Sequence, residues 1–570
     1  MRLRVVRRER GEPLDLGADV HPVLGRVYGA RGVRSRDDLD TSLERLAPVG
    51  TLEGIGAAVQ LLLAHRAEGR ILVIGDFDAD GATSTALMMR ALSAWGFPVD
   101  FLVPNRFEFG YGLTPEIVRL AARRAPTLIV TVDNGISSAA GVAEARSLGM
   151  RVLITDHHLP GTVLPEAEVI VNPNLPGSRF ASRALAGVGV AFYVLAALKR
   201  QLDARGLSPP AAPGVAEYLD LVALGTVADL VPLDANNRVL VSQGLKRIRA
   251  GRCAPGIRAL LELAGRRLER VTAADLAFAV APRLNAAGRL DDMTIGIQCL
   301  LADVEAQPLA ARLDALNRER RAIEAKMQTE ALAAVRRLSD PGPRAVRRNA
   351  VCLFDESWHQ GVVGLVASRI KERVRRPVIA FALAADGQLR GSARSVPGVH
   401  IRDVLAGLDA RHPGLIERFG GHAMAAGLTL QRSRLDAFAR CFDEEVAGWS
   451  EACRLADVIE TDGALEIGEI ALETAEALRA GGPWGQAFPE PCFDGVFTIR
   501  TARLVGERHL KMWVETSQGR SFDAIAFNFI AEGVEQALPE GARRLVYRLD
   551  VNEYQGERRL QLLVDHLLPA

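Results

Sequence analysis

The sequence predicts an α/β protein of several domains that ends in a β-barrel. Between about residues 70 and 175, apolar strand-like runs alternate with helix-like runs, a pattern typical of βαβ units around a parallel sheet. A long amphipathic stretch at 309–338 indicates one connecting helix, and a second α/β pattern follows at about 348–450. From about residue 455, short runs of alternating polarity predict a five-stranded barrel.

The composition narrows the class of protein. No apolar run approaches the ~20 residues of a membrane span, and the charged start MRLRVVRRERGEP lacks the apolar core of a signal peptide. Six scattered cysteines without a C-x-x-C pair argue against a zinc ribbon or a disulfide framework and favour a reducing, cytoplasmic location. The formal net charge is only +1, so any nucleic-acid-binding surface has to be local.

The order of these patterns divides the chain into five expected segments. Residues before about 50 carry no strong motif, and Asp340-Pro-Gly-Pro marks a boundary after the long helix. We expect an N-terminal segment at 1–50, a parallel-sheet domain at 51–305, a connecting helix and linker at 306–345, a second α/β domain at 346–452, and a barrel at 453–570.

The first strand of the predicted sheet, residues 71–75, runs directly into Asp76, Asp78 and Asp80. Alternate residues of an extended chain face the same side, so the three carboxylates can project together. Carboxylates that converge at a strand end repel one another, and a hard divalent cation with oxygen ligands relieves this repulsion. The alternative is a solvated acidic turn that caps the following helix.

Two later strands of the same region end in similar side chains. One runs into Asp133-Asn134-Gly135 and the other into Asp156-His157-His158. The carboxyl ends of parallel strands lie at one edge of a sheet, so these motifs can meet. Adjacent histidines on an extended chain face opposite sides, which predicts one metal ligand and one substrate contact or supporting donor.

A fourth acidic residue, Asp229, follows a largely apolar stretch at 215–228. By itself it is typical of a carboxylate that ends a helix or begins a turn. It gains significance as a fourth member of the ordered set.

The order of these four motifs resembles the DHH phosphoesterase superfamily, and within it most closely the bacterial exonucleases that degrade single-stranded DNA from its 5′ end. Later motifs extend this resemblance over nearly the whole chain. It implies a cytoplasmic, metal-dependent exodeoxyribonuclease that hydrolyses phosphodiesters and releases 5′-mononucleotides during DNA recombination and repair. It also identifies the second α/β domain as DHH-associated and the barrel as one of the oligonucleotide-binding type.

The resemblance implies a pair of Mn²⁺ or Mg²⁺ ions. Asp78 would hold one ion, Asp80 the other, and Asp133 would bridge them. Many members of the superfamily have a histidine four residues before the first of these aspartates, where this chain has Ile74. We therefore expect Asp76 to replace it.

The same resemblance assigns the remaining residues of the motifs. His157 and Asp229 would complete the coordination of the second ion. Asp156 would support the site and His158 would face the phosphate, and both are grouped as catalytic.

Substrate contacts are expected on three segments. Arg106 lies in the aromatic stretch PNRFEFGYGL, whose aromatic residues can stack on bases or pack within a loop, and Arg283 and Arg289 lie in PRLNAAGR. Residues 366–402 carry eight Lys or Arg and two acids, a local excess of +6. An arginine fork fits phosphate oxygens. The expected contacts in the second α/β domain are Arg369, Arg390, Ser392, Arg394, Gly421 and His422.

The expected partner is single-stranded DNA with a 5′ end, bound by a monomer that contacts no membrane. The resemblance further implies a single-stranded-DNA-binding protein and a RecQ-type helicase as partners. Residues 491–570 carry ten Lys or Arg against eleven acids, so the barrel can contact either DNA or protein. Two alternatives stay open: a DHH hydrolase of short oligonucleotides, cyclic dinucleotides or pyrophosphate, and a non-catalytic replication scaffold.

Overall fold

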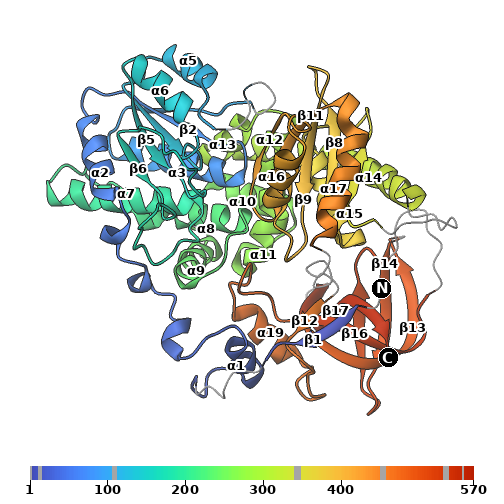
Figure 1. The fold of residues 1–570 in the computed structure, drawn as a ribbon. Coiled ribbons are helices and arrows are strands. Elements are labelled where there is room, and N and C mark those ends of the chain that lie inside the picture. The colour runs from blue at the N-terminus through green and yellow to red at the C-terminus, as the bar shows by residue number, and fades with distance from the viewer. Residues whose placement is uncertain are drawn as a thin grey trace. The chain divides into compact units, whose positions relative to one another are not determined.

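The chain folds into two compact units, each of which includes a segment from the other end of the sequence (Figure 1). The N-terminal unit comprises Gly11–Asn317 and Ala477–Glu490, and the C-terminal unit comprises Met1–Arg10, Arg318–Glu476 and Pro491–Ala570. The computed structural model describes residues 3–9, 16–105, 109, 112–338, 348–449, 458–506, 508–529, 538–554 and 557–570.

A five-stranded parallel sheet forms the centre of the N-terminal unit, as predicted, in the order β3-β2-β4-β5-β6. All residues of β2 and β4 are buried, which explains their uninterrupted apolar sequences. The strands are β2 (Ile71–Gly75), β3 (Val99–Leu102), β4 (Leu128–Val132), β5 (Arg151–Thr155) and β6 (Val169–Val171).

Helices cover both faces of this sheet. The face that carries Leu72, Ile74 and Ile129 packs against two helices, α5 (Pro115–Ala122) and α6 (Ala139–Ser147). The strand order and right-handed crossovers place α3 (Ala79–Ala94) on the opposite face. The other helices of this unit include α1 (Pro22–Gly29), α2 (Ile55–Ala64), α7 (Gly187–Ala204), α8 (Leu219–Ala228), α9 (Ala235–Arg249), α10 (Pro255–Leu263), α12 (Ala281–Leu290) and α13 (Thr294–Leu301).

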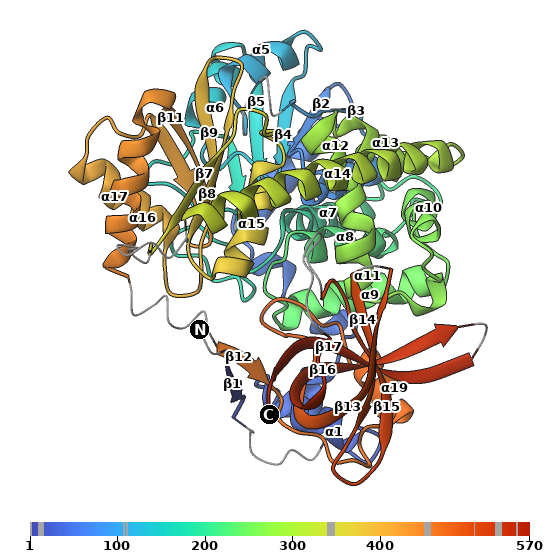
Figure 2. The ribbon, with the colours of Figure 1, turned by 90° about the vertical axis from the view of Figure 1, so that its right-hand side faces the viewer.

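The predicted long helix is α14 (Ala306–Leu338), which runs from the N-terminal unit into the C-terminal unit (Figure 2). It begins three residues earlier than the predicted start at Leu309, with Pro308 inside its first turn. Proline is tolerated there because first-turn amides have no acceptor within the helix. Among the described helices, none is by itself both long and apolar enough to cross a membrane, and only Leu43–Thr51 and Ile55–Ala64, bent by 80°, pass that test jointly.

The C-terminal unit contains the second α/β domain, whose mixed sheet has the order β10-β11-β9-β8-β7. Only β7 and β8 pair in parallel, and Phe381, Phe438 and Phe442 lie fully buried in the core. The elements are β7 (Val351–Phe354), α15 (Val363–Val374), β8 (Val378–Leu383), β9 (Gln388–Arg394), α16 (Ile401–Arg411), β10 (Arg418–Gly421), β11 (Ala425–Gln431) and α17 (Leu435–Ala447).

The chain ends in the predicted five-stranded barrel, which is closed in the order β13-β14-β15-β17-β16. A parallel pairing of β15 with β17 completes the barrel. The strands are β13 (Phe493–Val505), β14 (His509–Glu515), β15 (Ser521–Ala526), β16 (Gly541–Tyr554) and β17 (Glu557–Pro569).

An N-terminal strand that the sequence did not reveal joins the barrel region. Strand β1 (Arg4–Arg7) pairs in parallel with β12 (Val458–Thr461). Arg7 and Arg544 both donate to the buried Asp494 carboxylate, with Nη2–Oδ2 distances of 3.0 Å and 2.7 Å. Burial opposes ionisation of Asp494, but these two arginines and Thr461 outweigh it and lower its pKa to about 2. The first strand is thus attached to the barrel through one carboxylate.

Asp494→Asn should therefore reduce the free energy of unfolding of the C-terminal unit by about 1–2 kcal/mol at pH 7. This value is smaller than the full pKa shift implies, because solvent screens the half-exposed Arg7. Because the folded-state pKa is lowered, the contribution is present above pH 4 and is lost as the pH falls towards 2. Thermal unfolding between pH 2 and pH 7 measures this effect. Asp565→Asn, which removes an exposed pair with Arg548, is the control, and an equal pH slope in both variants would contradict the assignment.

A C-terminal segment, Ala477–Glu490, reciprocally completes the N-terminal unit. We call it the returning segment. The Tyr28 hydroxyl donates to the Gly481 carbonyl at 2.7 Å, and the Arg31 guanidinium donates to the Pro489 carbonyl at 2.8 Å. The Trp484 and Phe488 rings stack with centroids 5.2 Å apart. This segment therefore covers the surface of α1.

Candidate metal centre

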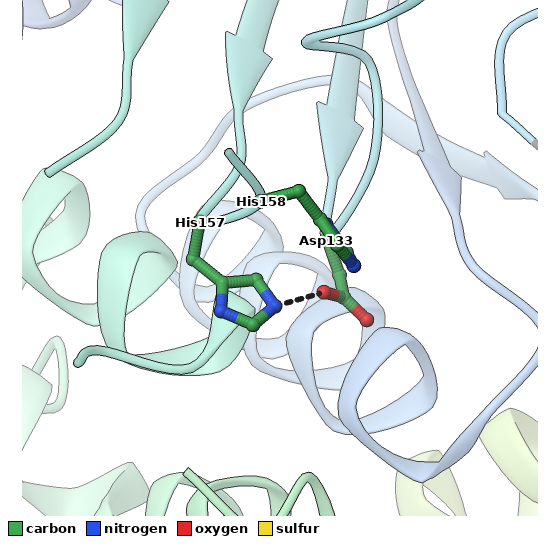
Figure 3. Close-up of side chains that lie close together, drawn as sticks. All are labelled: Asp133, His157 and His158. Carbon is green, nitrogen blue, oxygen red and sulfur yellow. Dashed lines mark ion pairs between the residues drawn. The ribbon is translucent and has the colours of Figure 1, made fainter. Parts of the chain in front are cut away.

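The carboxyl edge of the parallel sheet brings all four acidic motifs together. Asp76, Asp78 and Asp133 form one group whose ligand atoms all lie within 4.8 Å of one another, and Asp80, His157 and Asp229 form a second. Asp133 also forms such a group with His157 and His158 (Figure 3). Every residue predicted to hold a metal therefore belongs to at least one group.

The loop after β2 distributes its three aspartates between the two groups. The strand ends at Gly75, so the aspartates do not share one extended stretch. Asp78 caps the N-terminus of α3, where its Oδ1 accepts from the Gly81 amide at 3.0 Å, and Asp80 lies in the first helical turn. The change from loop to helix directs Asp80 away from the group of Asp76 and Asp78.

The loop after β4 requires an unusual backbone. Asp133 has a left-handed conformation (φ 61°), which aspartate tolerates better than most side chains, and Gly135 has φ 117°. Asn134 donates its side-chain amide to the carbonyls of Ile74 at 3.1 Å and Val132 at 2.9 Å. Asn134 thereby ties the ends of β2 and β4 together beneath the site.

Asp156 organises the loop after β5. Its Oδ1 accepts from the backbone amides of His157 and His158 at 2.7 Å and 3.1 Å and from His158 Nδ1 at 2.7 Å. Its Oδ2 accepts from the Ile136 amide at 2.9 Å. The buried carboxylate thus orients both histidines and the loop after β4.

The two histidines take different positions. His157 Nε2 lies 3.1 Å from Asp133 Oδ1 and 3.5 Å from Asp229 Oδ2, so it faces the carboxylates (Figure 3). His158 is held by Asp156 through Nδ1 and presents Nε2 on the other edge of its ring. His157 thus contacts two carboxylates directly, whereas His158 is held by Asp156 although its ring also belongs to a ligand group with Asp133 and His157. That one histidine binds a metal and the other contacts the substrate stays a prediction.

The fourth motif reaches the site from helix α8. Asp229 is the C-terminal cap of α8, and its amide donates to the Gly225 carbonyl at 3.0 Å. The sequence alone left open whether this carboxylate merely ended a helix. It does end the helix, and it also lies beside His157.

The electrostatics of the cluster favour a divalent cation. Burial and the neighbouring Asp78 raise the pKa of Asp80 to about 7, and burial and neighbouring aspartates raise the pKa values of Asp133 and Asp229 well above their ordinary range. The carboxylates therefore repel one another when they are ionised. Buried oxygen donors with one imidazole are the ligand set that Mn²⁺ and Mg²⁺ accept, so the residues fit such ions.

The pKa of His158 is also raised, but for a histidine this favours the charged form. Burial opposes its charged form, but the hydrogen bond to Asp156 and the charges of Asp156, Asp229 and Asp76 outweigh burial and raise its pKa to about 9. The imidazolium is therefore the stable form of the metal-free protein at neutral pH. A cation at this position can donate to a phosphate oxygen.

The PRLNAAGR stretch, in which two arginines were predicted to bind substrate, lies on helix α12. Arg283 is buried and donates to Asp314 Oδ1 at 2.9 Å and to the Ala279 carbonyl at 2.5 Å, which favours a structural role. Arg289 is half-buried in the last turn of α12. Arg106 lies outside the described residues. The roles of these arginines in binding substrate stay predictions.

Asn285 of the same stretch has a contact that sequence reasoning missed. Its Oδ1 accepts from the Ala79 amide at 2.8 Å, directly between Asp78 and Asp80. A Cβ atom at Gly288 would lie 1.9 Å from the Phe77 carbonyl oxygen, so α12 approaches the first motif at a glycine. The high proportion of small residues in this stretch was the feature of the sequence that could have indicated such close packing.

Four of the six predicted substrate contacts of the second α/β domain lie close together, near the start of α15. Arg394 donates to Ser392 Oγ at 2.9 Å, and a Cβ atom at Gly364, in the first turn of α15, would lie 2.9 Å from both side chains. Strand β11 places Ala425 opposite Arg394. The tight turn between β10 and β11, with Gly421 at φ 147° and His422 exposed, therefore adjoins them.

Two other predicted contacts of this domain have acidic partners. Arg390 donates to Asp386 at 2.8 Å and to Thr429 Oγ1 at 2.9 Å. Arg369 lies 3.2 Å from Glu324 and is about half exposed. Their roles in binding substrate also stay predictions.

Three family models match this chain. The DHH family N-terminal domain matches residues 70–226, the DHHA1 domain matches residues 348–448, and the RecJ OB domain matches residues 461–566.

Curated relatives match this chain over most of its length. The chain is 52% identical to the single-stranded-DNA-specific exonuclease RecJ of Escherichia coli, over 100% of this chain and 99% of that protein. It is 36% identical to the corresponding protein of Thermus thermophilus, over 86% of this chain and 68% of that one.

Solved structures show the same fold. The Thermus thermophilus RecJ structure with Mn²⁺ matches with a TM-score of 0.79 at 31% identity, over 100% of this chain and 80% of that one. The Mg²⁺ complex of the same protein matches with a TM-score of 0.73 at 30% identity, over 100% and 78% of the two chains.

Proposed function

The chain belongs to the RecJ family of DHH phosphoesterases, and from that membership we propose that it is a single-stranded-DNA-specific exonuclease with 5′-to-3′ polarity. It hydrolyses phosphodiesters with two Mn²⁺ or Mg²⁺ ions and releases 5′-mononucleotides in recombination and repair. The observation that carries this proposal is the convergence of five aspartates and His157 into two adjoining ligand groups. A pair of groups that share one edge of a sheet is what two-metal phosphodiester chemistry needs.

In this proposal each ligand group holds one ion. Asp76, Asp78 and Asp133 serve the first, and Asp80, His157 and Asp229 serve the second. The contact of 3.1 Å between Asp133 and His157 supports a bridging role for Asp133. When bound, two such ions activate a water molecule and stabilise charge on the phosphate.

The chain's own residues then hold and orient the phosphate. His158 is held through Nδ1 by Asp156, so its Nε2 would be oriented to donate to a non-bridging oxygen of the scissile phosphate. Asp156 fixes the ring and is itself positioned by the Ile136 amide. Asp156 therefore acts through His158 and His157.

A second anion site in the second α/β domain is proposed for the DNA backbone. Ser392 and Arg394 lie on β9 against Gly364 in the first turn of α15, and the positive end of the helix dipole favours an anion there. The exposed His422 adjoins them across the sheet. The hydroxyl, guanidinium and helix terminus together suit a phosphate group.

Arg394→Ala should weaken binding of single-stranded DNA about tenfold at low salt and reduce the slope of log K against log salt by about 1. The reason is that one phosphate contact, with its counterion release, is lost. Fluorescence anisotropy over a salt titration measures this change, with calorimetric Mn²⁺ binding unchanged. Arg402→Ala, an exposed arginine on α16, is the control, and equal slopes for wild type and Arg394→Ala would contradict the site.

The proposed cellular setting follows from the cysteines and from the substrate. The five described cysteines, 253, 299, 352, 441 and 492, are free, in keeping with a cytoplasmic location. A single-stranded-DNA-binding protein and a RecQ-type helicase are the proposed partners. The helicase would unwind duplex DNA, and the binding protein would protect the resulting single strand.

Mn²⁺-dependent digestion of one long strand, labelled at its 5′ end or its 3′ end, tests the proposal. Early release of the 5′ label as a mononucleotide, with the 3′ label retained on long products, is expected. Cleavage of only dinucleotides, cyclic dinucleotides or pyrophosphate would favour the small-substrate alternative. The absence of any hydrolysis would favour a scaffold.

A further inference from the structure

The N-terminus of helix α7 contacts a proposed metal ligand directly. The Gly187 amide donates to Asp80 Oδ2 at 2.6 Å, and the Val188 amide donates to Asp80 Oδ1 at 3.0 Å. The first amides of a helix have no acceptor within the helix, and the aligned peptide dipoles make this end partly positive. Both oxygens of the buried Asp80 carboxylate are therefore oriented by a neighbouring helix.

Glycines allow two helices to come this close to the ligands. A Cβ atom at Gly187 would lie 2.6 Å from Asp133 Cβ and 2.8 Å from Asp133 Oδ1. A Cβ atom at Gly225 of α8 would lie 2.3 Å from Thr83 Oγ1 and 2.8 Å from Asp80 Oδ1. Such contacts are shorter than any that real side chains make, so an alanine would displace the carboxylates or the helices.

The two glycines are placed against different ligands. Gly187 faces Asp133, which belongs to the first ligand group, while its amide holds Asp80 of the second. Gly225 of α8 also faces Asp80, close to Val188. The start of α7 thus contacts both groups, and a shift of this helix by a few tenths of an ångström changes both.

We infer that the N-terminal turn of α7, with Gly187 and Val188, is a positioning element of the metal centre, and that Gly225 of α8 supports it. The amides fix the direction of the Asp80 oxygens, and the missing side chains leave room for Asp80 and Asp133. This inference rests on the proposed two-metal function. It predicts that metal affinity depends on residues that cannot themselves bind a metal.

The main test is Gly187→Ala in the full-length protein, freed of metal and titrated with Mn²⁺ by calorimetry and electron paramagnetic resonance. Groups that orient metal ligands typically change affinity 10–100-fold, and we expect a weakening of that size. The Mn²⁺ concentration for half-maximal digestion should rise in proportion. Gly56→Ala is the matched control, because Gly56 lies in the first turn of α2 and has nothing within 4 Å of an added Cβ atom.

A second variant removes the hydrogen bond without adding volume. An amide-to-ester replacement at position 188 removes the N–H group that donates to Asp80 Oδ1. It leaves the hydrogen bonds within the helix in place, because a first-turn amide has no acceptor there. We expect about tenfold weaker Mn²⁺ binding, with an unchanged circular dichroism spectrum. This variant decides the question if Gly187→Ala does not fold.

The outcomes separate the inference from the function on which it rests. Native Mn²⁺ affinity in folded Gly187→Ala, or in the ester variant where Gly187→Ala does not fold, would overturn the positioning role and leave the exonuclease intact. Failure of the wild-type protein to bind Mn²⁺ would overturn both. A weakened affinity in the tested variant, with Gly56→Ala unchanged, would support the positioning role.

Discussion

Asp133→Asn should lower the rate of single-strand digestion by about 10³-fold or more, because loss of a bridging carboxylate removes several kcal/mol of transition-state stabilisation. Asparagine has the same shape and tolerates the left-handed backbone (φ 61°) of this position, so the loop should stay folded. Single-turnover digestion of a 5′-labelled strand at saturating Mn²⁺ measures the effect. The Mn²⁺ stoichiometry, measured by calorimetry, should fall in parallel.

The control for this variant is Asp100→Asn, which replaces an exposed aspartate of β3 that pairs with Arg124. It should digest DNA at the wild-type rate. The folded state of Asp133→Asn should be at least as stable as that of the wild type without metal, because burial and neighbouring aspartates raise the pKa of Asp133. Turnover within tenfold of the wild type would refute the bridging role.

The second large effect concerns the metal-free protein. Burial and the charge of Asp78 raise the pKa of Asp80 from its ordinary 3.8 to about 7. A carboxyl group whose pKa is raised by folding stabilises the folded state below its ordinary pKa, and this contribution is lost as the pH rises through the raised value. The metal-free N-terminal unit should therefore lose stability between about pH 4 and pH 7.

Saturating Mn²⁺ should remove this pH dependence and raise the unfolding temperature, because the cation binds the ionised carboxylates. At 100 times the dissociation constant, each site adds about 2.7 kcal/mol to the free energy of unfolding. Thermal unfolding from pH 4 to pH 8, with chelator or with Mn²⁺, measures both effects. Asp80→Asn should flatten the metal-free slope, and a slope that is the same with and without Mn²⁺ would contradict this prediction.

The strands and the proposed ligands were predictable because each depends on local sequence. Buried parallel strands need uninterrupted apolar runs, which stand out in the sequence. A parallel sheet has only one carboxyl edge, so Asp133 and Asp156, which each follow a strand, had to lie at the same edge. The closed barrel followed from short runs of alternating polarity. The placement of Asp80 in a helix rather than on an extended chain could not be predicted from alternation alone.

What escaped prediction depends on contacts between residues far apart in the sequence. Nothing near Asn285 indicates that it accepts from the first amide of α3, and nothing near Gly187 indicates that Asp133 lies against it. An arginine in a small-residue stretch has the same sequence signature whether it binds a phosphate or, as Arg283 does, a buried aspartate. The four-residue strand β1 is too short to stand out from its surroundings.

The returning segment has a consequence for how the molecule is made. A ribosome synthesises the sheet and all the proposed metal ligands long before Ala477–Glu490 emerges. Until then, the aromatic face of Tyr28 is uncovered. The Leu233 amide, four residues after Asp229, also lacks its acceptor, the Gln486 carbonyl, to which it donates at 2.8 Å in the folded protein. A nascent chain can therefore complete the packing around α1 and Leu233 only after Glu490 has been synthesised, far later than the metal ligands themselves.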